Sequence, residues 1–189
     1  FAVATIEEAF ELRNARLTKR ILCLGGFYSG QENAGLAEHI TPAVFTIDAA
    51  ERLDRAAAER GETAAVHIKI DTGMGRVGVP FGHISEFADR LAALQNIEVE
   101  ALMTHFAAAD DLAENSFTAR QTAQFDEVAA VFRDRGFRPA FVDLANSPGA
   151  IAHPRSRADM VRLGGVLYGL SGDGIPAGIE RPELKPVLS

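Results

Sequence analysis

Cysteine is nearly absent from this chain, which has 189 residues and a single cysteine, Cys23. One cysteine excludes both a framework of internal disulfides and a metal centre built from thiolates, and it suits a reducing compartment. Long apolar runs are missing as well: none approaches the roughly 18 residues of a membrane-spanning helix, and no charged leader precedes an apolar segment. We therefore expect a cytoplasmic protein with no membrane partner.

Positive charge is also in short supply, with 19 Lys and Arg residues against 26 Asp and Glu and a net charge of −7. This balance, without a basic stripe or a platform of aromatic side chains, argues against a nucleic-acid partner. The rest of the composition is ordinary for a globular protein, since 47% of the residues are hydrophobic and 24% are charged. We expect one domain with a substantial core, or a part of a larger one.

Short apolar runs alternate with amphipathic stretches along the chain. The amphipathic stretches place apolar residues at intervals of three and four, which predicts helices at 6–17, 48–61, 84–94 and 117–136. The apolar runs predict seven strands, at 1–5, 21–25, 43–48, 66–71, 99–105, 141–146 and 160–165. Strict alternation indicates an α/β fold with a parallel sheet, because parallel neighbours need a crossover that is usually a helix.

Polar side chains at the strand ends favour a closed barrel over an open doubly wound sheet. In the run HIKID, His67, Lys69 and Asp71 share one face of the strand, and Ile68 and Ile70 share the other. Three polar groups are costly on a face covered by helices but natural at the mouth of a barrel that holds a ligand. We expect a (β/α)8 TIM-type barrel that is incomplete, with about seven of its eight strands present and the missing strand at the amino end.

The stretch GMGRVG, residues 73–78, has the G-x-G-x-x-G spacing of a dinucleotide-binding loop. Such a loop should follow the first strand of its unit and open directly into a helix. Here the stretch follows the fourth predicted strand, and Pro80 and Gly82 predict a loop that continues to about residue 83. We interpret the glycines as permitting a tight loop that carries Arg76, and not as a pyrophosphate site.

Four motifs together carry a resemblance to a known family. HIKIDTGMGRVG, MTHFAAAD, LANSPGAI and MVRLGGVLYGL, in this order and at these intervals, resemble the pyridoxal-phosphate-binding barrel of bacterial alanine racemases. The opening FAVATIEEAFELRNA and the closing LKPVLS resemble that family too, so the likeness extends over nearly the whole chain. It implies an isomerase that uses pyridoxal 5'-phosphate to interconvert L- and D-alanine, which supplies D-alanine for peptidoglycan precursors.

The resemblance implies a set of cofactor-binding residues. Arg162 is expected to donate a hydrogen bond to the pyridine nitrogen, which keeps that nitrogen unprotonated and makes the ring a weaker electron sink. The phosphate is expected to bind Asn146, Ser147 and the backbone of Gly164 and Gly165, although Gly165 stands where the family usually has a larger residue. From the residues alone, Asn146 or Ser147 could instead cap a following turn.

The resemblance also implies roles for residues beside the reacting atoms. His105 is expected to pack against the cofactor ring, and Arg76 to contact its phenolic oxygen and the region of the substrate carboxylate. Lys69 resembles a lysine that is often carbamylated in the family, a change that replaces repulsion between two cations by attraction. Without carbamylation, Lys69 beside Arg76 requires a lowered pKa or a nearby carboxylate such as Asp71. No metal ligands are implied.

Two parts of the family's catalytic machinery do not occur in these 189 residues. The family's first barrel strand carries the lysine that forms the Schiff base with the cofactor, and a second, β-rich domain contributes a tyrosine across a homodimer interface. We expect a barrel domain truncated at its N-terminus at 1–184 and the start of the second domain at 185–189. The chain alone is therefore expected to be inactive, and the full-length protein to be an active homodimer.

Other functions stay open on the sequence alone. The same barrel class includes other pyridoxal-phosphate-dependent racemases and decarboxylases, and Lys69 on the lumen face could itself form the Schiff base. A metal-dependent barrel lyase or hydrolase would use His67, Asp71 and His105 as ligands, against repulsion from Lys69 and Arg76. A barrel that only binds a ligand would have no activity.

Overall fold

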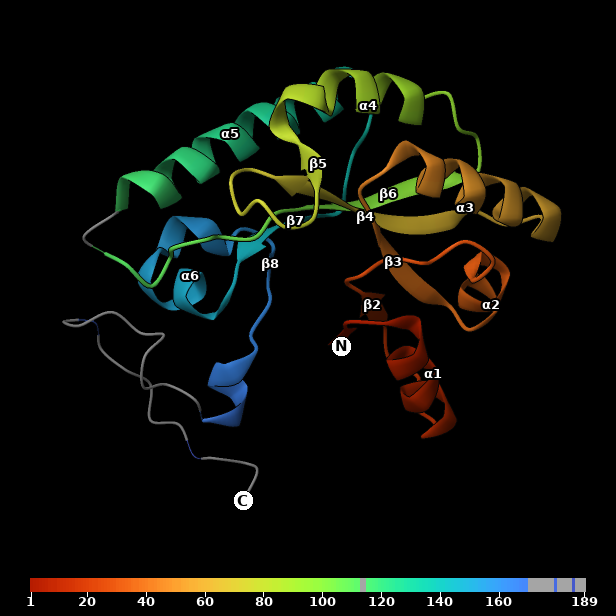
Figure 1. Ribbon diagram of the computed structural model, residues 1–189, viewed down its shortest axis with the longest axis horizontal. Helices are drawn as coiled ribbons and strands as arrows, with labels where there is room; N and C mark the ends of the chain where they lie inside the picture. The colour runs from red at the N-terminus through yellow and green to blue at the C-terminus, as the bar shows by residue number, and fades with distance from the viewer. Residues whose placement is uncertain (113–114, 170–178, 180–184, 186–189) are drawn as a thin grey trace.

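The computed structural model describes residues 1–112, 115–169, 179 and 185. Seven parallel strands follow one another in the order β1-β2-β3-β4-β6-β7-β8, and β5 pairs with β4 outside that path. The strand bounds are β1 Ala2–Val3, β2 Ile21–Cys23, β3 Ile40–Val44, β4 Ala64–Asp71, β5 Val79–Pro80, β6 Ile97–Met103, β7 Phe141–Ala145 and β8 Met160–Val161. Within the described part of the chain β1 and β8 are not paired with each other, so the curled sheet is an incomplete barrel (Figure 1).

Helices follow the strands in turn and lie outside the curve of the sheet, where α3, α4 and α5 arch over its convex side (Figure 1). The helix bounds are α1 Ile6–Asn14, α2 Glu32–Ala37, α3 Ile47–Arg60, α4 Ile84–Leu91, α5 Asn115–Asp134 and α6 Ser147–Ala152, with 3-10 turns η1 Phe81–His83, η2 Pro154–Arg157 and η3 Gly165–Tyr168. This arrangement confirms the predicted α/β class and the incomplete (β/α)8 barrel. No helix among the residues placed by the structure is long and apolar enough to cross a membrane.

Strand β4 separates two different interiors. Ile68 and Ile70 are buried in the main core, where helix residues such as Leu53 and Phe125 lie. Side chains alternate along a strand, so His67 and Lys69 face the lumen. A smaller apolar cluster lies apart from the main core and consists of Leu22, Ala43 and Met103. The predicted division of the run HIKID between a helix face and a polar lumen face agrees with this burial.

The predicted strand 43–48 is wrong at both ends, because β3 starts at Ile40 and the chain already enters α3 at Ile47. Thr46 is the reason: its side-chain oxygen accepts a hydrogen bond of 3.3 Å from the backbone N–H of Ala49, which caps the helix.

The short helices α2 and α6 were not predicted. The proposed boundary between residues 184 and 185 and the segment 185–189 lie outside the described residues, Lys185 excepted, and stay a prediction.

The loop of the GMGRVG stretch folds back onto its own strand. One carboxylate oxygen of Asp71 accepts hydrogen bonds from the N–H groups of Gly73 (2.9 Å) and Gly75 (3.0 Å). Gly73, Gly75 and Gly78 have φ values of 131°, 68° and 147°, which favour glycine. The chain then forms β5 and η1, and α4 begins only at Ile84. The glycine N–H groups thus bind Asp71 and open no helix, as the interpretation against a dinucleotide site expects.

Candidate active site at the strand ends

A pocket of about 320 Å³ lies at the carboxyl ends of β6, β7 and β8. Its lining comes from three separate segments that follow these strands and consists of His105, Asn146, Ser147, Pro148, Arg162, Gly164, Gly165 and Val166. Six of these eight are residues that the resemblance singled out. The carboxyl ends of barrel strands are where active sites form in this architecture. The structure therefore brings most of the predicted site together.

The loops after β7 and β8 are joined by a hydrogen bond of 3.0 Å from the Gly164 N–H to the Ser147 hydroxyl oxygen. Ser147 keeps its own hydroxyl hydrogen for another acceptor, because it acts only as the acceptor in this bond. Asn146 caps α6 by accepting from the Gly149 N–H at 3.1 Å, and its amide donates to the Phe106 carbonyl at 3.2 Å. Asn146 therefore caps α6, and both Asn146 and Ser147 line the pocket, while their contact with a phosphate stays a prediction.

Arg162 follows β8 and is held by groups from β6 and β7. Its Nη2 donates a hydrogen bond of 2.5 Å to the Thr104 carbonyl oxygen, and its Nη1 forms an ion pair with the carboxylate of Asp143. Asp143 has no exposed surface, and this burial raises its pKa to about 6 while the charge of Arg162 acts in the opposite direction. Asp143 was not predicted, although a carboxylate inside the apolar strand FVDLA is a visible signal.

His105 is a neutral histidine with a defined tautomer. The Arg162 Nη2 lies 3.4 Å from Nδ1 of His105. Since arginine only donates hydrogen bonds, Nδ1 is the acceptor and the hydrogen is assigned to Nε2. Burial, followed by the charges of Arg162, Arg76 and Lys69, lowers the pKa of His105 to about 4. At neutral pH its imidazole is therefore uncharged.

Lys69 and Arg76 add positive charge beside this pocket without lining it. Lys69 is only 8% exposed, and burial lowers its pKa, followed by the charges of Arg162 and then Arg76, against the opposing effect of Asp71. Arg76 is exposed on the loop after β4. A lowered pKa is one of the conditions expected for the unmodified residue. Among the charged neighbours, Arg162 lowers the pKa of Lys69 more than Arg76 does. Carbamylation of Lys69 stays a prediction.

Gln121 on α5 organises the strand ends from behind and was also missed. Its side chain is completely buried, and its amide nitrogen donates hydrogen bonds of 3.1 Å to the Thr72 hydroxyl and to the His105 carbonyl. Its amide oxygen accepts from the Ala107 N–H at 3.0 Å. A signal existed, since this glutamine interrupts the buried stripe of the helix, which otherwise contains Thr118, Phe125, Val128 and Phe132.

The alternative metal centre of His67, Asp71 and His105 is not formed. Nε2 of His67 lies 3.1 Å from a carboxylate oxygen of Glu100, Asp71 binds glycine N–H groups, and His105 faces Arg162. Across residues 1–112 and 115–169, no group of three or more His, Cys, Asp or Glu side chains is placed to hold a metal ion. Each member of this alternative ligand set has a different partner, so the described structure does not support that alternative.

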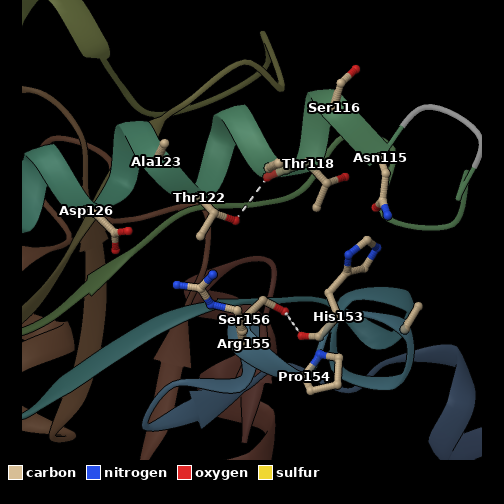
Figure 2. Close-up of a pocket in the computed structure, with 12 residues that line it drawn as sticks. Asn115, Ser116, Thr118, Thr122, Ala123, Asp126, His153, Pro154, Arg155 and Ser156 are labelled. Carbon is tan, nitrogen blue, oxygen red and sulfur yellow. Dashed lines mark hydrogen bonds between the residues drawn. The ribbon is translucent and has the colours of Figure 1, made fainter.

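A larger pocket of about 590 Å³ lies between α5 and the segment that runs from the end of α6 through η2 (Figure 2). Its walls are held by local hydrogen bonds, from Thr122 to the Thr118 carbonyl (3.0 Å) and from Ser156 to the His153 carbonyl (2.8 Å). None of the predicted site residues lines it. The smaller pocket at the strand ends remains the candidate site, because the charged and hydrogen-bonding groups converge there.

Comparison with known proteins adds three findings. The family model described as alanine racemase, N-terminal domain, matches residues 1–172. The curated alanine racemase of Geobacter sp. (strain M21) is 38% identical over 179 residues, which are 92% of this chain and 47% of that relative. The solved structure of the alanine racemase of Clostridium difficile 630 matches with a TM-score of 0.89 at 32% identity, covering 98% of this chain and 48% of the other. This chain thus spans about half the length of the curated relatives it matches.

Proposed function

Because this chain belongs to the alanine racemase family, we propose that the protein containing it interconverts L- and D-alanine with pyridoxal 5'-phosphate. The observation that carries this proposal is the pocket in which His105, Ser147 and Arg162 meet from three separate segments. Further parts of the proposal are a homodimer in the cytoplasm, a contribution to D-alanine biosynthesis, and a β-rich domain beyond the barrel. The 189-residue chain alone is expected to be inactive.

The residues of the pocket fit an anionic cofactor. Its lining contains the Arg162 guanidinium, the Ser147 hydroxyl and backbone N–H groups at the start of η3, and it contains no carboxylate side chain. The first N–H groups of a helical turn have no acceptor within that turn, which suits them to a phosphate. A Cβ added at Gly164 would meet nothing within 4 Å, so space is open beside these donors.

The residues that line the pocket then have distinct roles toward the cofactor. When bound, pyridoxal phosphate supplies an electron-withdrawing ring that stabilises negative charge at the substrate α-carbon. Ser147, Asn146 and the backbone of Gly164 and Gly165 hold and shape the phosphate subsite. Arg162 donates to the ring nitrogen.

The remaining charged groups act on Arg162 and on the substrate. Neutral His105 accepts a hydrogen bond from Arg162 and so keeps that guanidinium in orientation. Arg76 adds positive charge that attracts the substrate carboxylate, and a carbamylated Lys69 would hold Arg76 in place by attraction.

A racemisation assay tests the proposal. The native protein that contains this chain, incubated with pyridoxal phosphate and L-alanine, is expected to form D-alanine, detected with a D-amino-acid oxidase, while the 189-residue chain is expected to form none. Carbon dioxide release from amino acids without racemisation would instead assign the protein to a decarboxylase of the same barrel class. Racemisation of another amino acid in place of alanine would overturn the choice of substrate.

A second assignment of the reactive lysine is favoured by one observation, the lowered pKa of buried Lys69, since an unprotonated amine is the form that attacks an aldehyde. Borohydride reduction of the chain with pyridoxal phosphate tests it. We expect no stoichiometric adduct on Lys69. An adduct of one cofactor per Lys69 would make this residue the Schiff-base lysine and would replace the expectation that the reactive lysine lies in another segment.

A further inference from the structure

The carboxylate of Asp143, in strand β7, is completely buried, pairs with Arg162 and does not line the pocket. We propose that Asp143 is a positioning residue, which fixes the orientation of the Arg162 guanidinium toward the pocket and balances its charge. The inference rests on the proposed function in one respect, namely that Arg162 faces the cofactor ring. It goes beyond that function because it assigns a role to a residue that does not line the pocket.

Arg162 is the counter-charge that pairs with Asp143. Nη1 of Arg162 pairs with Oδ1 of Asp143, and no other group pairs with this carboxylate in the described structure. A buried carboxylate with so few partners is expensive to desolvate, and removing one member of such a pair leaves an uncompensated buried charge. A hydrophobic residue would suit the strand better if packing were the only requirement. The pair is therefore better explained by what it does to Arg162.

The contacts of Arg162 fix the plane of its guanidinium. The ion pair attaches Nη1 to β7, the hydrogen bond to the Thr104 carbonyl attaches Nη2 to the end of β6, and Nη2 also faces Nδ1 of His105. A guanidinium is a rigid planar fork, so attachment at both terminal nitrogens determines its plane. Without Asp143 the attachment at Nη1 is lost. We expect the Arg162 guanidinium then to rotate toward solvent, which its side chain already reaches, being 12% exposed.

Charge gives a second reason. Lys69, Arg76 and Arg162 all act on His105 as positive charges. Asp143 opposes this excess at Arg162 without lining the pocket itself. Arg162 can therefore present N–H donors to the pocket while its charge is partly balanced by Asp143. This balance lowers the repulsion between Arg162 and Lys69.

The test is a double-mutant cycle on pyridoxal phosphate binding to the native protein that contains this chain, with Asp143→Asn, Arg162→Leu and both together. The dissociation constant is followed by cofactor fluorescence. We expect D143N to weaken binding by about tenfold, equivalent to about 1.4 kcal/mol, and to have less than a twofold effect when Arg162 is already replaced. Asp89→Asn is the matched control, because Asp89 forms an ion pair of 2.6 Å with Arg135 but its side chain is 63% exposed.

A second readout does not depend on the cofactor. The Nε–H resonance of Arg162 in a ¹⁵N–¹H spectrum is expected to report a restrained guanidinium in the wild-type protein and in D89N, and an averaged one in D143N. Asp143→Glu keeps the charge and is expected to restore part of the restraint, which also covers the case in which D143N does not fold.

The outcomes are distinguishable. An unchanged resonance in folded D143N would overturn the proposal, and so would an equal loss of cofactor affinity in both Arg162 backgrounds, since that loss would be general destabilisation. A native protein that neither binds the cofactor nor racemises alanine would overturn the proposed function, while the resonance would still decide the role of Asp143.

Discussion

The side-chain amide of Gln121 donates a hydrogen bond of 3.1 Å to the backbone carbonyl of His105, which joins a covering helix to the candidate-site histidine. The same amide also binds Thr72 at the end of β4 and Ala107 in the loop after β6. An outer helix thus fixes the ends of two barrel strands relative to each other. The position of His105 depends on a residue that never reaches the pocket.

Gln121→Leu is expected to destabilise the folded chain by about 3 kcal/mol, because it leaves several buried polar groups without partners. The measurement is urea unfolding followed by circular dichroism. Gln124→Leu is the matched control on the same helix: Gln124 is only partly buried and no hydrogen bond involves its side chain in the described structure, so we expect a change within about 0.5 kcal/mol. Equal losses of unfolding free energy in both variants would show that the hydrogen bonds of Gln121 contribute nothing specific to stability.

Two glycines of the GMGRVG loop are expected to differ sharply on substitution. At Gly78 a Cβ would lie 2.5 Å from the backbone nitrogen of Asp71, whereas at Gly75 it would meet nothing within 4 Å. Gly78→Ala therefore costs at least about 3 kcal/mol, and Gly75→Ala about 1 kcal/mol for its positive φ. Thermal unfolding of the two variants checks whether Gly78→Ala loses more stability than Gly75→Ala. Equal losses would show that the loop rearranges to accept the added Cβ at Gly78.

His105 is expected to make the fold sensitive to acid. Its pKa is lowered from 6.5 to about 4 in the folded chain, so between these values the unfolded chain binds more protons. Stability from this residue is complete above pH 6.5 and falls as the pH decreases toward 4. The raised pKa of Asp143 acts in the opposite sense over an overlapping range.

The contribution of His105 must therefore be isolated by difference. His105→Gln is expected to lose less stability than the wild type between pH 6.5 and pH 4, and His83→Gln, at an exposed histidine, to follow the wild type. Direct titration by NMR provides the second measurement. A His105 midpoint near 6.5 would contradict the described burial and charge environment.

Ser147→Ala is expected to weaken pyridoxal phosphate binding by roughly tenfold, because a hydroxyl that donates to a phosphate makes a charge-assisted hydrogen bond. The melting temperature should change little, since the Gly164 N–H that loses its acceptor lies at an exposed position where water can replace it. Ser116→Ala, at an exposed position on α5, is the control. Unchanged cofactor affinity in S147A would remove Ser147 from the proposed phosphate subsite.

The sequence predicted the local features of the fold better than its long-range ones. All seven barrel strands were located, because apolar runs and strand alternation are encoded within a few neighbouring residues, as in HIKID. The end of β3 was placed too late because Val44 and Ile47 are both apolar, and the cap at Thr46 between them was not weighed. Helices α2 and α6 have only six residues each, too few to show helical periodicity.

Site residues were predicted where a motif marked them and missed where only tertiary contacts did. His105, Ser147 and Arg162 stand in motifs at strand ends and do line one pocket. Asp143 and Gln121 act through partners 19 and 16 positions away, respectively, and nothing in the local pattern names those partners. Both are buried polar residues inside apolar patterns, and that anomaly is the signal to follow in a chain of this kind.

The crowding of positive charge around His105 has a thermodynamic consequence for how this protein is handled. Arg162 and Arg76 both act on buried Lys69 as repelling charges, and this repulsion opposes folding. An anion bound among them relieves that repulsion and stabilises the folded form by mass action, by about 2.7 kcal/mol at a concentration a hundred times its dissociation constant. Ligand occupancy and thermal stability are then coupled, and we expect a melting curve recorded in phosphate buffer to differ from one recorded without an anion.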